Sequence, residues 1–254
     1  MGRTAIVTGA SRGIGYAIAL ALAEEGFDIA AVALPDAERM AELAGEVTAR
    51  GRRFASYALD IGSVPDHEPV LEAISRDLGA VDCLVNNAGV SVRRRGDLLE
   101  VSHDSYDRCF DVNTRGTFFW TQAVARGMAA TPPPGRHRSI VFVTSSNAVA
   151  ASVDRGEYCM SKTALSMAAR LFAIRMAPLG VGVYEVQPGI ILTEMTAPAK
   201  AKYDALIADG MLVEPRWGMP EDVARTVRSM AAGLLPYTVG QEVRVDGGLL
   251  LKRF

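Results

Sequence analysis

The chain has 254 residues, of which 49% are hydrophobic and 22% charged, so it is long and apolar enough to bury a substantial core. Its formal net charge of −2 gives no electrostatic reason to expect nucleic acid or an anionic membrane as a partner. Three cysteines without a CxxC pair, three isolated histidines and no apolar run of about 18 residues argue against disulfides, a metal site and a membrane span, so we expect a cytoplasmic protein.

Short apolar, β-branched runs alternate with longer stretches of helical periodicity along the chain. This alternation is typical of βαβ units, in which helices connect parallel strands. Most of the predicted strands are apolar throughout, as expected when helices cover both faces of a sheet. We therefore predict one α/β Rossmann-type domain over residues 1–254, with a doubly wound parallel sheet of about seven strands. The strands are expected at residues 4–8, 28–33, 54–59, 81–85, 139–144, 182–186 and 241–245, and the helices at 14–25, 37–50, 64–78, 105–130, 157–177 and 220–232.

Two segments interrupt this alternation. Residues 131–138 contain three consecutive prolines, which cannot continue a helix, and are expected to form an exposed connection. Residues 192–216 follow a predicted strand but show weak periodicity and contain several prolines. Because a long irregular segment inside a compact domain is commonly functional, we predict a substrate lid there.

A glycine-rich loop connects the first predicted strand to the first predicted helix. Gly9 permits a tight turn, Gly13 lets the backbone approach a pyrophosphate, and Gly15 allows the helix to pack closely on the strand. The helix N-terminus offers unpaired N–H groups and a positive dipole end to a phosphate. The loop therefore predicts a dinucleotide site, formed by Gly9, Ser11, Arg12, Gly13, Ile14 and Gly15, rather than a turn without a ligand.

Further motifs follow in a fixed order: Asp60-Ile61, Asn86-Asn87-Ala88-Gly89, Tyr158-Cys159-Met160-Ser161-Lys162 and Pro188-Gly189-Ile190-Ile191-Leu192-Thr193. Together with the TGxxxGxG spacing of the loop, they resemble the short-chain dehydrogenase/reductase family over essentially the whole chain, and in particular its 3-oxoacyl-carrier-protein-reductase-like branch. The resemblance implies an NAD(P)-dependent oxidoreductase that moves a hydride between the nicotinamide and a carbonyl or secondary alcohol carbon of a small molecule.

Tyr158 and Lys162 are four residues apart on a predicted helix, so their side chains share one face. A free phenol has a pKa of about 10 and is a poor base at neutral pH. A nearby ammonium is expected to lower that pKa, which would bring the phenol closer to the range of general acid–base catalysis.

The resemblance assigns roles to further residues. Ser145, with Ser146 as a competitor, would hydrogen-bond the substrate oxygen, and Asn113 would hold a water that links Lys162 to solvent, which completes the catalytic set Asn113, Ser145, Tyr158 and Lys162. The cofactor contacts that the resemblance implies beyond the glycine loop are Asp60, Ile61, Asn87, Ala88, Gly89, Tyr158, Lys162, Pro188, Gly189, Ile191 and Thr193.

The cofactor preference depends on the end of the second predicted strand. An NAD enzyme of this fold has an acidic residue there that binds the adenosine ribose, but this chain has Ala33 and Leu34. Asp36 could reach the ribose only if the turn doubles back. Arg12 could pair with a 2′-phosphate, although arginine there also occurs in NAD users of the family. We therefore favour NADP(H) over NAD(H).

Polar residues are expected around the substrate. Asp154, Arg155 and Glu157 make one expected wall polar, and residues 93–95 form the basic run Arg-Arg-Arg. These residues favour a sugar, polyol or oxo acid over a long acyl chain, and the alternative that they are solvated rim residues stays open.

Several functions therefore stay open: a 3-oxoacyl-thioester reductase, a sugar, polyol or oxo-acid dehydrogenase, and a catalytically inactive dinucleotide-binding regulatory protein. The phenol–lysine pair argues against the last, because a binding module does not need it. An epimerase or dehydratase of this fold usually has a longer substrate domain. The resemblance also implies a homotetramer, with residues 105–130 and 157–177 across one two-fold axis and residues 240–254 across another.

Overall fold

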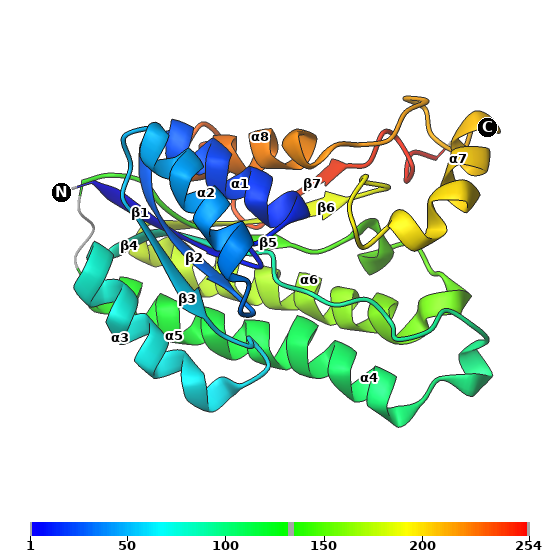
Figure 1. Cartoon of the computed structure of the whole chain (residues 1–254), viewed down its shortest axis with the longest axis horizontal. Helices are drawn as coiled ribbons and strands as arrows, with labels where there is room; N and C mark the ends of the chain where they lie inside the picture. The colour runs from blue at the N-terminus through cyan, green and yellow to red at the C-terminus, as the bar shows by residue number, and fades with distance from the viewer. Residues whose placement is uncertain (1, 132–134, 253–254) are drawn as a thin grey trace.

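The computed structural model describes residues 2–131 and 135–252. Within these residues, seven strands form one parallel sheet in the order β3-β2-β1-β4-β5-β6-β7, with helices on both faces (Figure 1). The predicted doubly wound α/β fold is thereby confirmed. The strands are β1 (Arg3–Thr8), β2 (Phe27–Ala33), β3 (Phe54–Ala58), β4 (Val81–Asn86), β5 (Arg138–Val143), β6 (Val181–Pro188) and β7 (Glu242–Val245).

The helices form two layers that enclose the sheet. Helices α1, α2 and α8 lie on one face, and α3, α5 and α6 lie on the other (Figure 1). The helices are α1 (Gly13–Glu24), α2 (Ala37–Ala49), α3 (His67–Leu78), α4 (His103–Phe110), α5 (Thr117–Ala130), α6 (Gly156–Met176), α7 (Lys200–Ala208) and α8 (Pro220–Ala231).

Strand β2, which lies between β1 and β3, shows why the inner strands are largely apolar. Successive side chains of a strand point to opposite faces, so Ile29 and Ala31 join the core under α1 and α8, while Ala30 and Val32 join the core under α3 and α5. All seven residues of β2 are buried. Because both faces are covered, polar alternation would place unpaired polar groups in one of the two cores.

The strand order places the functional motifs at one edge. The chain winds outward from β1 in one direction and then, starting at β4, in the other. Ligands of doubly wound sheets bind at such a switch point, at the carboxyl ends of the strands. Gly9 directly follows β1 and Asn87 directly follows β4, so both predicted cofactor motifs meet there.

The helix predicted over residues 105–130 is interrupted. A π-helical turn, Asp111–Gly116, separates α4 from α5. The Thr117 hydroxyl donates to the carbonyl of Val112, five residues earlier. A Cβ added to Gly116 would lie 2.1 Å from the carbonyl oxygen of Ile61, so the absent side chain lets this turn approach the loop after β3. Hydrophobic periodicity did not reveal the interruption.

The connection predicted over residues 131–138 is exposed only in part. Its three prolines lie outside the described residues, whereas Arg138 begins β5 and is only 3% exposed. The Arg138 guanidinium donates to the carbonyls of Met128 and Leu179. The prediction was wrong for Arg138 because a guanidinium can be buried where it pairs with carbonyl groups at helix ends.

The segment 192–216 contains a helix that its sequence did not predict. Tyr203 and Ile207, four residues apart on α7, are its buried side chains. They pack with Ile190 and Leu212 in a small cluster separate from the two main cores. Two buried residues are too few to produce a recognisable helical periodicity.

Candidate active site

The glycine loop is held tightly against the end of β1. Gly9 has a φ of 67°, in the region that favours glycine. A Cβ added to Gly15 would lie 2.1 Å from the Gly9 carbonyl oxygen, so helix α1 reaches the loop only because residue 15 is glycine. Arg12, the N-cap residue of α1, makes no side-chain capping hydrogen bond. The first N–H groups of α1 are therefore suited to a phosphate ligand.

The Asn87 side chain braces this loop. Its Nδ2 donates to the carbonyls of Thr8 at 2.9 Å and Gly9 at 3.2 Å. The Thr8 hydroxyl accepts from the backbone N–H groups of Asn87 and Ala88, both at 3.0 Å. The motif after β4 thus fixes the shape of the glycine loop, and the Asn87 amide, predicted as a cofactor contact, has this structural role.

Tyr158, Ser145 and Lys162 come together beside this edge of the sheet. Tyr158 and Lys162 lie one turn apart on α6, with the Lys162 Nζ 5.8 Å from the centre of the phenol ring. Ser145 follows β5 and hydrogen-bonds Tyr158. The three residues are at most 8% exposed. No such bond is found for the competitor Ser146, although it is also buried.

Burial dominates the electrostatics of this cluster. It raises the pKa of the Tyr158 phenol, against the opposing effects of the Ser145 hydrogen bond and the Arg155 charge. It also lowers the pKa of the Lys162 ammonium to about 8. The expectation that Lys162 lowers the phenol pKa was therefore wrong for this structure, since burial disfavours the charged forms of both groups.

Asn113 links the loop after β4 to helix α6. It lies in the π-helical turn and is fully buried. Its Oδ1 accepts from the N–H of Val90 at 2.8 Å, and its Nδ2 donates to the Val90 carbonyl and the Ser161 hydroxyl, both at 3.0 Å. A Cβ added to Gly89 would lie 3.2 Å from the Asn113 Oδ1 and 3.3 Å from the Lys162 Nζ, so Asn113 and Lys162 flank the same glycine.

Glu185 is a buried residue near Lys162 that sequence reasoning missed. It lies on β6, is 1% exposed, and opposes the lowering of the Lys162 pKa. Its carboxylate accepts from the Thr144 hydroxyl at 2.5 Å, the Ser166 hydroxyl at 2.8 Å and the Gln187 amide at 3.0 Å. The sequence does not mark Glu185 as part of the site, because the Thr144 and Ser166 hydroxyls that bind it come from distant parts of the chain.

Replacing Glu185 with leucine is expected to destabilise the fold by at least about 2 kcal/mol, because it leaves buried donors without their acceptor. Glu185→Gln is the matched control. It keeps one acceptor oxygen, and the Ser166 hydroxyl can accept from the new amide, so a smaller loss is expected. Urea unfolding of both variants measures the difference. A leucine variant as stable as the wild type would contradict this account.

The other predicted cofactor residues lie along the same edge. The Asp60 carboxylate accepts from the N–H of Gly62, and Ile61 is buried. The chain after β6 passes over the glycine loop, since a Cβ added to Gly13 would lie 3.4 Å from the Thr193 methyl group. Pro188 ends β6, the Gly189 N–H donates to the Val245 carbonyl, and Ile191 is buried.

Sequence reasoning also missed an ion cluster at the start of α2. The Glu194 carboxylate pairs with Arg12 at 2.9 Å and with Arg39 at 2.5 Å. Two guanidinium groups thus converge on one anion, next to the glycine loop and the end of β2. Arg39 could have been found by counting from the second predicted strand, whereas Glu194 comes from the segment after β6 and shows no such signal.

Only part of the basic run 93–95 joins the site. Arg93 pairs with Asp104 and Arg94 with Glu100, and both side chains are exposed. Arg95 is partly buried and lies 3.4 Å from the Asp154 carboxylate. The solvated interpretation therefore holds for the first two arginines, while Arg95 reaches the predicted polar wall.

The polar wall lies against the phenol. The Arg155 guanidinium carbon is 5.6 Å from the centre of the Tyr158 ring. Glu157 is 2% exposed and accepts from the Ser105 hydroxyl at 2.6 Å. The Tyr203 hydroxyl, on α7, accepts from Arg155 at 3.3 Å and from Arg95 at 3.5 Å. These side chains are buried or partly buried rather than a solvated rim.

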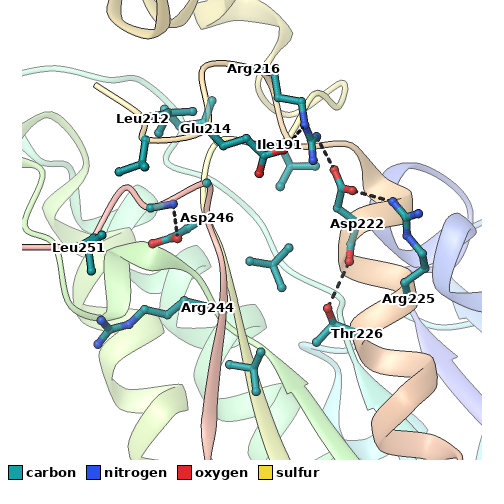
Figure 2. A pocket seen from close by; sticks show the side chains of 17 residues that line it. Ile191, Leu212, Glu214, Arg216, Asp222, Arg225, Thr226, Arg244, Asp246 and Leu251 are labelled. Atoms are coloured by element: carbon teal, nitrogen blue, oxygen red, sulfur yellow. Dashed lines mark hydrogen bonds and ion pairs between the residues drawn. The ribbon is translucent and has the colours of Figure 1, made fainter. Parts of the chain in front are cut away.

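A separate cavity of about 670 Å³ lies between the segment after α7, helix α8 and the chain after β7 (Figure 2). Four of its charged side chains pair with one another: Glu214, Arg216, Asp222 and Arg225. Figure 2 shows the Asp222 carboxylate, which lies 2.7 Å from both Arg216 and Arg225. The residues that line it do not include the Tyr158 cluster. Throughout the part of the chain that the structure describes, we find no helix with the length and apolar character of a membrane span, and no cluster of metal-ligating side chains.

Comparisons with known proteins agree with this geometry. A family model for short chain dehydrogenases matches residues 3–204. The chain is 32% identical to a 2-dehydro-3-deoxy-D-gluconate 5-dehydrogenase from Dickeya dadantii, over 99% of this chain and 96% of the relative. It is 31% identical to a 3-oxoacyl-(acyl-carrier-protein) reductase from Staphylococcus aureus, over 99% of each chain.

Among solved structures of similar proteins, one contains NAD and another contains NADP. A 3-oxoacyl-(acyl-carrier protein) reductase from Brucella melitensis in complex with NAD is 40% identical with a TM-score of 0.95, over 100% of this chain and 99% of that chain. A putative 2-deoxy-D-gluconate 3-dehydrogenase from Agrobacterium tumefaciens with bound NADP is 28% identical with a TM-score of 0.86, over 98% and 97%. The chain therefore belongs to the short-chain dehydrogenase/reductase family and is an NAD(P)-dependent oxidoreductase.

Proposed function

We propose that this protein transfers a hydride between the nicotinamide of NADP(H) and a carbonyl or secondary alcohol carbon, with Tyr158 as the catalytic acid and base. The observation that carries the proposal is the buried contact of Tyr158 with Ser145, beside Lys162 and the glycine loop. A solvated tyrosine–lysine pair on a helix surface would not need these partners.

The protonation state favours Tyr158 as a proton donor during reduction. Since burial raises its pKa, the phenol is protonated at neutral pH and can give its proton to the carbonyl oxygen. The Ser145 hydroxyl would stabilise the charge that develops on that oxygen. Lys162, with a pKa of about 8, can return a proton near neutral pH, and Asn113 would connect it to solvent.

The loop after β1 fits a dinucleotide, which would supply or accept the hydride when bound. The uncapped N-terminus of α1 and the backbone at Gly13 would hold the pyrophosphate. The resemblance carries the remaining contacts to the chain segments after β3, β4 and β6. Residues 192–216 would close over the substrate as a lid.

We favour NADP(H) because two guanidinium groups converge at the adenosine end, while the end of β2 carries no acidic residue. Ala33 is apolar, and the Asp36 carboxylate accepts from the N–H of Arg39, so it caps α2. Arg12 and Arg39 both contact the Glu194 carboxylate, so the two guanidinium groups are able to converge on one anion, as binding of a 2′-phosphate would require.

Replacing Arg39 with glutamine is expected to weaken NADPH binding about tenfold and to change NADH binding less than about threefold, since the 2′-phosphate alone needs the second guanidinium. Glu194→Gln is expected to tighten NADPH binding, because it removes a competing carboxylate. Arg50→Gln, whose arginine pairs with Glu46 at the other end of α2, is the matched control. Fluorescence titration measures each constant, and NADH binding tenfold more tightly than NADPH in the wild type would contradict the preference.

The function itself is tested by following nicotinamide absorbance with the purified protein. Oxoacyl thioesters, sugar ketones, oxo acids and diketones form the substrate panel, because the relatives' names include both an oxoacyl reductase and a sugar-acid dehydrogenase. Turnover of at least one ketone supports the oxidoreductase. Tight dinucleotide binding without any oxidation or reduction across the panel would instead favour the inactive regulatory protein.

We also propose a cytoplasmic homotetramer. The described cysteines are unpaired, as in a reducing compartment. Leu171 and Ile174 on α6 are 55% and 74% exposed, beside an apolar groove shared with α5. An exposed apolar face of this kind favours burial against a second copy. Sedimentation equilibrium of the purified protein tests it, and a monomer at micromolar concentration would exclude it.

A further inference from the structure

The Arg155 guanidinium lies beside the candidate catalytic phenol and has no carboxylate partner among the described residues. Its guanidinium carbon lies 5.6 Å from the centre of the Tyr158 ring. Within residues 2–131 and 135–252, its buried Nε has no hydrogen-bond partner, and the guanidinium makes one long side-chain hydrogen bond, of 3.3 Å, to the Tyr203 hydroxyl. A buried donor without an acceptor is uncommon and is a natural position for a ligand oxygen.

The neighbouring charges leave one positive charge unbalanced. Arg95 and Lys202 share the Asp154 carboxylate, at 3.4 and 3.5 Å. Glu157, two residues after Arg155, is engaged by the Ser105 hydroxyl. Among the described residues, no carboxylate lies within ion-pair distance of Arg155. Arg155 is therefore the guanidinium of this polar wall that, among the described residues, has no carboxylate partner, which favours a ligand with a single negative charge.

We propose that Arg155 binds the carboxylate of the substrate, so that the substrate is a short oxo acid or the corresponding hydroxy acid. This inference rests on the proposed function, because it takes Tyr158 to mark the reacting carbonyl. A guanidinium binds a carboxylate through two parallel hydrogen bonds, and the buried Nε supplies one of the donors. A phosphate, with a charge of about −1.5 to −2, would exceed the unbalanced charge.

The position of Arg155 limits the length of the substrate. Arg155 is the N-cap residue of α6, and Tyr158 lies in the first turn of the same helix. The carboxylate and the reacting carbonyl must therefore be only a few bonds apart. Tyr203 on α7 contacts Arg155 from the segment after β6 and is 6% exposed, so it would shield the proposed ion pair from water.

The test compares each acid with its own methyl ester: 3-oxobutanoate and 4-oxopentanoate against methyl 3-oxobutanoate and methyl 4-oxopentanoate. The wild type is expected to favour the acids in kcat/KM by at least about tenfold. Arg155→Gln is expected to lower kcat/KM for the acids by about 10- to 100-fold, mainly through KM, and to change the esters less than about twofold. Arg155→Lys keeps the positive charge but cannot form the two parallel hydrogen bonds. Its kcat/KM for the acids should therefore lie between those of the wild type and Arg155→Gln. Arg94→Gln, an exposed arginine paired with Glu100, is the control and should change nothing.

A binding measurement separates this proposal from the proposed function. Calorimetric titration of 3-oxobutanoate into the Tyr158→Phe variant with NADPH should still show binding, and adding Arg155→Gln should abolish it. Turnover that survives Tyr158→Phe would overturn the proposed function while leaving the carboxylate site standing. The carboxylate site is overturned if Arg155→Gln weakens acids and esters equally, or if the wild type neither prefers nor binds the acids.

Discussion

Replacing Tyr158 with phenylalanine is expected to lower kcat by roughly 100- to 10,000-fold, with the dinucleotide dissociation constant changed less than about threefold. The substitution removes only the hydroxyl, and the ring still fills the same buried space. What is lost is the proton that the phenol gives to the substrate oxygen and its hydrogen bond with Ser145. Steady-state turnover and fluorescence titration of the two proteins measure the two effects separately.

Tyr184→Phe is the matched control for this result. Tyr184 is also a buried tyrosine, 4% exposed, and its hydroxyl donates to the Leu235 carbonyl away from the candidate active site. Loss of that hydroxyl should affect stability slightly and kcat very little. If both variants lose activity to the same extent, or if Tyr158→Phe keeps more than a tenth of the wild-type kcat, Tyr158 is not the proton donor.

Replacing Gly15 with alanine is expected to reduce dinucleotide affinity at least tenfold and to lower the free energy of unfolding by about 1–3 kcal/mol. The added Cβ would lie 2.1 Å from the Gly9 carbonyl oxygen and 2.5 Å from the Asn87 Nδ2. The Gly9 contact is with backbone, so the loop itself must shift. That shift would also disturb the N–H groups offered to the pyrophosphate. Titration with NADPH and urea unfolding measure the two losses.

Gly45→Ala shows what the same substitution does where space allows. Gly45 is an exposed residue inside α2, and an added Cβ would meet no atom within 4 Å. Because alanine favours a helix over glycine, this variant should be stabilised by up to about 1 kcal/mol with unchanged affinity. A Gly15→Ala protein that binds NADPH as tightly as Gly45→Ala would show that the loop tolerates a side chain.

The two substrate classes named among the relatives differ in where they carry charge, and the carboxylate test of Arg155 separates them. An oxo acid or sugar acid presents a carboxylate close to the carbonyl, whereas an oxoacyl thioester presents a neutral chain there. If the wild type prefers free acids and Arg155→Gln removes that preference, the chain groups with the acid dehydrogenases. A preference for the thioester that survives Arg155→Gln would place it with the oxoacyl reductases.

The sequence by itself determined the layers of the fold and the residues around Tyr158. Apolar strands, the glycine loop and the Tyr158–Lys162 pair are local patterns, since each needs only the spacing of neighbours along one strand, turn or helix. The strand ends then bring the loops after β1 and β4 together, because parallel strands in a doubly wound sheet share one carboxyl edge.

Only the tertiary structure decided the contacts that set protonation and specificity. Arg12 and Glu194 are 182 residues apart in the chain, and Arg155 and Tyr203 are 48 apart. No periodicity in the sequence predicts such pairs, because they form only when the segment after β6 folds back over the edge of the sheet. The same folding buries Tyr158 and Lys162, and burial moves the pKa of the phenol opposite to the direction that their spacing alone predicts. On a solvated helix surface, the lysine charge would be the main influence on the pKa of a tyrosine four residues away. In this protein the packing around α6 buries both side chains, and burial dominates their pKa values instead.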